Sequence, residues 1–228
     1  MKTKRIGILL SAFLLAAMVI VPGVSAYQAS SYGNTYSNLD TNQVASDAAD
    51  ELYDMGYVST AHTGYPGATA ARNLMSSDNV FFFDGHGSPG IIQFADSNDA
   101  YLTARADTGY PHLQTSSGQL ADIVLAVYMA CNTNVASDTY GNVAYQSFVE
   151  GVDMSLGWTG TINSGQSEYW SERFWYWLDE GCSVKIASQR ATSDTSTAYG
   201  GDLAGMGNYA CRSNGNCAST IDPARAGS

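Results

Sequence analysis

Two stretches of the chain are continuously apolar over the length of a buried strand. They occupy residues 80–83 (Val-Phe-Phe-Phe) and 123–129, and Gly, Pro or Asn follows each. Such runs are typical of strands buried on both faces of a parallel sheet. In open α/β sheets, reactive side chains lie just beyond the carboxyl ends of the strands, and here His86 and Cys131 take those positions.

The rest of the pattern predicts helices alternating with strands. Val44, Ala48 and Leu52 share one face of a helix that Asp40 or Thr41 can cap. Further helices are expected at 68–76, 143–150 and 167–180 and through Ala187 and Ala191, and strands at 57–63 and 152–158. The aromatic residues of 167–180 recur at helical spacing, which favours core packing over a sugar-binding surface. The alternation predicts an α/β fold, a three-layer α-β-α sandwich with a mostly parallel central sheet.

The first 26 residues have the pattern of a secretory signal peptide. A basic start precedes an apolar run, and Val-Ser-Ala at 24–26 forms a small-residue cleavage site. A retained membrane anchor is the alternative. Cleavage leaves 228 − 26 = 202 residues, which suits one domain. Residues 27–40 are polar and indicate a loose N-terminal arm or a polar edge strand, so the domain is placed at 41–228.

The negative net charge of the chain argues against two classes of binding partner. The net charge is −11, and removing three basic residues with the signal peptide makes it −14. Phosphate backbones and anionic lipids would repel such a surface, so neither nucleic acid nor a membrane is expected as a partner after cleavage. The segment Asp-Ser-Asn-Asp at 96–99 lacks the glycine and terminal Glu of an EF-hand, so no metal is expected there. No cofactor is expected either.

His86 and Cys131 have the chemistry of a general base and a nucleophile. They are 131 − 86 = 45 residues apart, with His first. A buried structural cysteine or a disulfide partner is the alternative for Cys131, and a structural residue is the alternative for His86. Asp84 lies two residues before His86 and is interpreted as a structural acceptor.

The two motifs resemble those of the caspase-like superfamily of cysteine peptidases (clan CD). Met-Ala-Cys-Asn-Thr-Asn at 129–134 is similar to the Ser-Ala-Cys-x-Thr-Gly of CHAT domains, with Asn134 in place of Gly. Phe-Asp-Gly-His-Gly at 83–87 is similar to the His-Gly strand of metacaspases and gingipains. The resemblance covers roughly residues 41–200. The family's first strand should be apolar, and nothing before Thr41 is.

The resemblance implies a secreted or extracellular cysteine endopeptidase acting on peptides or proteins, with Cys131 and His86 as its catalytic pair. It implies an oxyanion hole formed by the backbone amides of Gly87 and Cys131. Related peptidases often carry an acidic or amide residue two before the nucleophile, where it reads the P1 side chain. Here that position is Met129, so a preference for Arg or Lys would need another acid, such as Asp84 or Asp153.

The remaining cysteines decide whether Cys131 is free. In an exported protein the default for four cysteines is two disulfides, with three possible pairings. The segment 211–217 is interpreted as the tip of a hairpin spanning 209–219, which predicts that Cys211 and Cys217 form the only disulfide. Two rival functions stay open: a catalytically silent caspase-fold module that binds ligands, at the cell surface for instance, and a disulfide-stabilised structural exoprotein.

Overall fold

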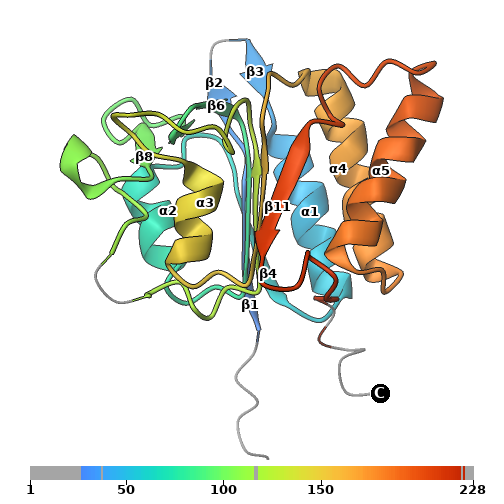
Figure 1. Ribbon diagram of the computed structural model, residues 1–228, viewed down its shortest axis with the longest axis horizontal. Coiled ribbons are helices and arrows are strands. Elements are labelled where there is room, and N and C mark those ends of the chain that lie inside the picture. The colour runs from blue at the N-terminus through green and yellow to red at the C-terminus, as the bar shows by residue number, and fades with distance from the viewer. Residues whose placement is uncertain (1–26, 37, 116–117, 222, 224–228) are drawn as a thin grey trace, which may run out of the picture.

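The computed structural model describes residues 27–36, 38–115, 118–221 and 223. The expected signal peptide at 1–26 lies outside these residues. The chain forms three layers, with a six-stranded sheet between two layers of helices (Figure 1). The strand order is β11 (Tyr209–Ser213), β10 (Met154–Trp158), β9 (Leu125–Met129), β5 (Val80–Asp84), β1 (Gln28–Tyr32) and β4 (Val58–His62). All neighbours are parallel except β11 and β10. The predicted fold class is confirmed.

The two apolar runs form the centre of the sheet. All five residues of β5 and all five of β9 are buried, and the strands pair directly. Three helices cover one face: α1 (Asn42–Asp54), α4 (Ser164–Asp179) and α5 (Val184–Ala198). The other face carries α2 (Ala68–Leu74) and α3 (Val143–Val149). Alternate residues of the central strands point to opposite faces, so Phe82 and Phe81 belong to separate apolar clusters.

The N-terminal segment differs from its sequence-based interpretation. Instead of an arm or an edge strand, Gln28–Tyr32 is the inner strand β1, paired with both β5 and β4. Ser30 and Ser31 are buried in it. The prediction failed because small polar side chains can occupy an inner strand whose backbone groups pair on both sides, and hydropathy does not report that pairing. The short strands β2 (Thr35–Tyr36) and β3 (Leu39–Asp40) follow and pair with each other.

The segment between β5 and β9 contains regular structure that its polar composition did not predict. β6 (His86–Ser88), β7 (Ile91–Gln93) and β8 (Tyr101–Thr103) form an antiparallel sheet, and a short 3-10 helix follows at Ala106–Thr108. Ile92 in β7 and Leu102 in β8 are fully buried. Strands of three residues are too short for an alternating pattern to be recognised. Residues 119–122, which lead into β9, form a turn.

The C-terminal disulfide was predicted correctly, but its hairpin was not. Cys211 and Cys217 are bonded, with their Cα atoms 6.4 Å apart. Cys211 lies in β11, which pairs antiparallel with β10 rather than with the residues after it. Cys217 lies in a turn, where the Ser213 hydroxyl accepts hydrogen bonds from the backbone of Gly215 and of Cys217. Pairing with β10 therefore replaces the expected 209–219 hairpin.

Candidate active site

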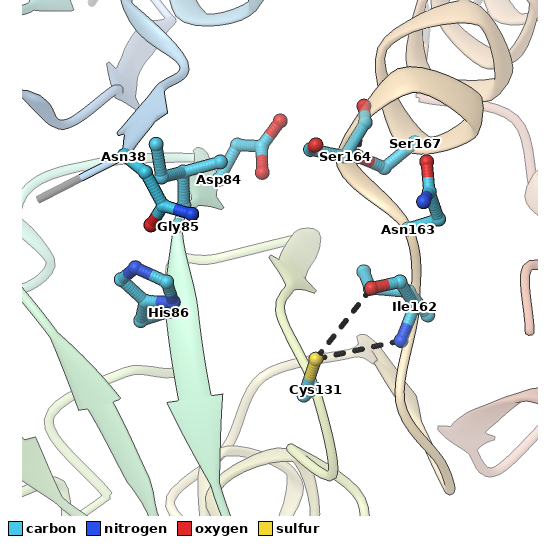
Figure 2. Close-up of a pocket in the computed structure, with 10 residues that line it drawn as sticks. Asn38, Asp84, Gly85, His86, Cys131, Ile162, Asn163, Ser164 and Ser167 are labelled. Atoms are coloured by element: carbon cyan, nitrogen blue, oxygen red, sulfur yellow. Dashed lines mark hydrogen bonds between the residues drawn. The ribbon is translucent and has the colours of Figure 1, made fainter. Parts of the chain in front are cut away.

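His86 and Cys131 line the same cleft. β5 and β9 are parallel neighbours with Asp84 opposite Met129 in register, so both chains leave the sheet at the same edge. His86 follows the end of β5 by two residues, and Cys131 follows the end of β9 by two. The cleft has a volume of about 300 Å³ (Figure 2). Its lining residues are Asn38, Leu39, Asp84, Gly85, His86, Cys131, Ile162, Asn163, Ser164 and Ser167.

The thiol of Cys131 contacts the backbone of Ile162. The Ile162 N–H donates to Sγ at 3.4 Å, and Sγ lies 3.8 Å from the Ile162 carbonyl oxygen (Figure 2). Cys131 is partly exposed and is not in a disulfide. Sulfur therefore has access to the cleft, and a fixed N–H donor that stabilises negative charge on it.

The loop after Cys131 is held by Thr133, which ties it to the neighbouring strands. The Thr133 hydroxyl donates to the Tyr128 carbonyl at 2.9 Å and accepts from the backbone N–H of Trp158 at 3.1 Å. Its side chain is fully buried. Asn132, which lies between Cys131 and Thr133, takes a left-handed backbone conformation with φ of 59°. This geometry turns the chain sharply just after Cys131.

Asn134 connects the same loop to the edge strand β11. Its side-chain amide donates to the Ala210 carbonyl at 3.1 Å. Its side-chain oxygen accepts from Arg212, at 3.2 Å from Nε and 3.1 Å from Nη2. The asparagine that stands where related motifs have glycine thus anchors the cysteine loop.

His86 begins β6 and is partly exposed in the cleft, opposite Cys131 (Figure 2). The Tyr36 ring lies edge-on to its imidazole, with ring centroids 5.9 Å apart. A Cβ atom on the next residue, Gly87, would lie 2.8 Å from both the Ala130 Cβ and the Cys131 carbonyl oxygen. Only glycine allows β6 to pack this closely against the cysteine loop.

The N-terminal segment fixes the end of β5. The Thr41 hydroxyl donates to the Asp84 carbonyl oxygen at 2.8 Å, and the Asn34 amide donates to the same oxygen at 3.4 Å. Both side chains are buried. Asn34 was not predicted, and Thr41 was expected only as a helix cap, because only the insertion of β1 beside β5 brings these residues to the site. The Thr41 side chain makes no cap hydrogen bond and binds the Asp84 carbonyl instead.

One predicted role, that of Met129, needs revision. Met129 does not line the cleft; it is fully buried in the core, because its side chain points to the face that α1 and α4 cover. Asp84 does line the cleft and is an acceptor, as expected: Thr41 and Asn34 donate to its backbone carbonyl, and the Gly85 amide donates to its carboxyl. Burial, reinforced by the charge of Glu168, holds the pKa of its carboxyl well above the ordinary range, and the backbone amide of Gly85 opposes this only in part.

The wall opposite His86 was also missed. Ile162, Asn163, Ser164 and Ser167 belong to the start of α4 and the turn before it. Their signal was indirect: the expected strand at 152–158 is parallel to β9 and beside it, so the chain that follows must emerge next to Cys131. His62 and His112 lie elsewhere, His62 stacked on Tyr32 and His112 near the Tyr110 carbonyl.

Nothing among the described residues indicates a metal centre or a membrane-spanning helix. No group of three or more His, Cys, Asp or Glu side chains in this part of the chain could hold a metal ion. No helix within the described ranges has the length and apolar character needed to cross a bilayer.

Comparison with known proteins identifies the fold. No protein-family model matches the chain, and no curated sequence matches it. The crystal structure of the Arg-specific cysteine proteinase gingipain R (RgpB) matches with a TM-score of 0.64 and 12% identity, over 87% of this chain and 49% of that one. A complex of Porphyromonas gingivalis RgpB pro- and mature domains also matches, with a TM-score of 0.64 and 11% identity, over 87% of this chain and 50% of that one. The chain spans about half the length of these proteins, and its fold is caspase-like.

Proposed function

We propose that this protein is a cysteine peptidase with Cys131 as nucleophile and His86 as general base. The observation that carries the proposal is the cleft itself. Two neighbouring parallel strands each deliver one member of the pair to it, and the Ile162 N–H donates to the sulfur. The caspase-like fold adds support, because the similar solved structures are of a cysteine proteinase.

The reaction follows from the chemistry of the pair. His86 accepts the thiol proton, and the Cys131 thiolate attacks the carbonyl carbon of the scissile peptide. The imidazolium then donates its proton to the leaving amine, the C–N bond breaks, and an acyl-enzyme thioester remains. A water molecule, deprotonated by His86, attacks the thioester carbonyl. The acid product leaves and the thiol is restored.

The backbone amides of Gly87 and Cys131 are proposed to bind the oxyanion. Ser88 and Ile91 close a two-residue turn, so they form the hydrogen-bonded pair of the β6–β7 hairpin. The next pair, Gly87 with Ile92, is then the non-hydrogen-bonded type, which directs the Gly87 N–H away from β7. The close packing of Gly87 on the Cys131 loop supports this assignment, because it brings the two residues next to each other. Each preorganised donor contributes on the order of 3 kcal/mol to transition-state stabilisation.

The test is cleavage of a mixed peptide library by the wild type and by Cys131→Ala and His86→Ala. Each variant should lose more than about a thousandfold in kcat/KM while keeping the wild-type circular dichroism spectrum. Cys182→Ala and His112→Ala are the matched controls, since both side chains lie outside the cleft, and they should retain activity. Wild-type turnover that survives loss of either cleft residue would exclude the proposed pair.

A binding module without turnover is the second candidate. The observation that favours it is that the chain spans only about half the length of the similar proteinases, at 11–12% identity, so the likeness carries the fold and not the activity of those proteins. Peptide binding with no cleavage of any library member, and no labelling of Cys131 by a thiol-reactive peptide probe, would support this alternative.

A further inference from the structure

A second cavity, on the side of the central sheet that carries α2 and β8 (Figure 1), has a lining unlike the rest of this acidic chain. Its volume is about 410 Å³, and it shares no lining residue with the cleft of His86 and Cys131. The chain has 21 Asp and Glu residues against 10 Lys and Arg, yet the lining contains an Arg, a His and no acid. The lining residues are Thr69, Arg72 and Asn73 from α2, and Tyr110, Pro111, His112, Thr115 and Gln119 from the segment after β8. This cavity can therefore accept a negative charge that most of the surface would repel.

The charge of the lining comes from Arg72, which is half-buried and forms no ion pair with any carboxylate of the described residues. Its Nε donates to the His112 carbonyl oxygen at 2.8 Å, and its Nη2 donates to the side-chain oxygen of Gln119 at 3.3 Å. Both acceptors are neutral, and a guanidinium has five N–H donors. Burial lowers the pKa of Arg72, and the charges of Tyr128 and Glu150 oppose this only in part. A partly desolvated cation with neutral partners favours the binding of an anion.

The carboxylates beside the cavity are engaged by other groups. Asp99 accepts from the backbone N–H of Thr69 at 2.7 Å and from its hydroxyl at 2.9 Å. Glu150, which acts on Arg72 at longer range, is buried and accepts from the side-chain amide of Gln146 at 2.8 Å. The Arg72 guanidinium is thus the charge that a ligand inside the cavity would meet.

The neutral part of the lining suits a sugar. The side-chain amides of Asn73 and Gln119 are exposed, and each can both donate and accept, as sugar hydroxyls also do. The Tyr110 ring is 41% exposed and is held by Tyr101, with ring centroids 5.3 Å apart. It offers a fixed apolar surface beside the polar groups, and the C–H face of a sugar ring can pack on such a surface.

The backbone around the cavity argues against an extended peptide as the ligand. The Thr103 N–H donates to the Pro111 carbonyl oxygen at 2.9 Å, and the Leu113 N–H donates to the Thr103 carbonyl oxygen at 2.9 Å. Residues 111–113 therefore cover the outer edge of β8. No strand edge is open there for a peptide to extend the sheet.

We propose that this cavity binds an acidic sugar, a uronic acid residue of a polysaccharide. The remaining N–H groups of Arg72 pair with its carboxylate, Tyr110 packs against its ring, and Asn73 and Gln119 bind its hydroxyls. The site is independent of the proposed peptidase function, because the two cavities share no residue.

Trigalacturonate and its methyl ester test the role of Arg72, because they share the same rings and differ in charge. Each is titrated into the wild-type protein by calorimetry. Trigalacturonate should bind at least about tenfold more tightly than the ester, and Arg72→Gln should bring that ratio to within about threefold of one. Arg105→Gln is the matched control: Arg105 is exposed, lies outside the lining and donates to the Asp138 carbonyl oxygen. It should keep the wild-type ratio.

A second variant keeps the test valid if loss of Arg72 loosens the segment that it holds to α2. Tyr110→Ala should weaken both sugars by at least about threefold while keeping the wild-type circular dichroism spectrum. Equal affinity of wild type for the two sugars, or an equal loss of preference in Arg105→Gln, would refute the site. A less stable Arg72→Gln protein with an unchanged preference would make Arg72 purely structural and overturn the proposal. Binding of N-acetylglutamate amide that depends on Arg72, without binding of trigalacturonate, would assign the cavity to acidic peptide side chains and refute the sugar.

Discussion

At the scale of single residues, buried carboxyl groups are the most sensitive points of this acidic chain. Asp84 and Asp78 are both 3% exposed, and each has an Oδ2 atom without a partner among the described residues. Asp84 lies at the cleft, where a ligand can compensate its burial. Asp78 follows α2, just before β5, and does not line the cleft. The burial of its carboxyl therefore affects only the stability of the fold.

Asp78→Asn should stabilise the protein at neutral pH. Burial raises the pKa of the Asp78 carboxyl from 3.8 to about 6, and a hydrogen bond from the Ser30 side chain lowers it only in part. The folded state therefore binds more protons than the unfolded state between about pH 4 and 6, and stability falls as pH rises through that window. The variant should be more stable than wild type by about 1–3 kcal/mol at pH 7, and the difference should shrink toward pH 4.

Urea unfolding of both proteins between pH 4 and pH 8 measures this effect. The control is Asp122→Asn, which removes the same charge from an exposed position nearby. A pH-independent difference between Asp78→Asn and wild type would show that the amide acts by packing rather than by titration.

At the scale of elements, strand ends were easier to predict than strand neighbours. The positions of His86 and Cys131 follow from two local features, an apolar run and the residues that close it. The neighbours of β5 do not, because Ser30 and Ser31 in β1 give no hydropathy signal, and their placement depends on backbone pairing with strands far along the chain. The contacts of Thr41 and Asn34 with the end of β5 were missed for the same reason.

The edge strand β11 should influence catalysis through Arg212, as a positioning residue. Arg212 on β11 holds the side-chain oxygen of Asn134, three residues after Cys131. Arg212→Ala leaves this oxygen without its strongest donor and loosens the link between the cysteine loop and β11, which then rests on the hydrogen bond from the Asn134 amide to the Ala210 carbonyl. We expect kcat to fall about tenfold with little change in KM, and a loss of about 1 kcal/mol in stability.

Steady-state kinetics and urea unfolding of three variants test this role. Arg212→Lys retains a cation but not the paired donors, so it should recover activity only in part. Arg190→Ala is the control, because Arg190 lies over the Trp177 ring, away from the cleft, and its kcat should be that of wild type. A wild-type kcat in Arg212→Ala despite lower stability would assign Arg212 a purely structural role.

At the scale of the whole molecule, the disulfide and the predicted signal peptide can be compared with the boundary of the folded domain. The Cys211–Cys217 disulfide is of a kind that persists in oxidising surroundings. The expected cleavage after Ala26 leaves Tyr27 as the first residue, and β1 begins at Gln28. Removal of the predicted signal peptide would thus keep every residue of an inner strand of the sheet. The sequence features that predict export and the boundary of the folded domain agree to within two residues.

This agreement predicts where the mature protein begins and how much of its N-terminus is dispensable. Expressed with residues 1–26 in a host that exports proteins, the chain should be recovered outside the cytoplasm with an intact mass that starts at Tyr27. A version beginning directly at Tyr27 should fold with the same cooperative thermal transition. A version beginning at Gly33 should not fold cooperatively, because removing β1 leaves β4 unpaired and opens the buried edge of β5. An exported protein that keeps residues 1–26 would favour a membrane anchor, and a stable fold without β1 would contradict its place inside the sheet.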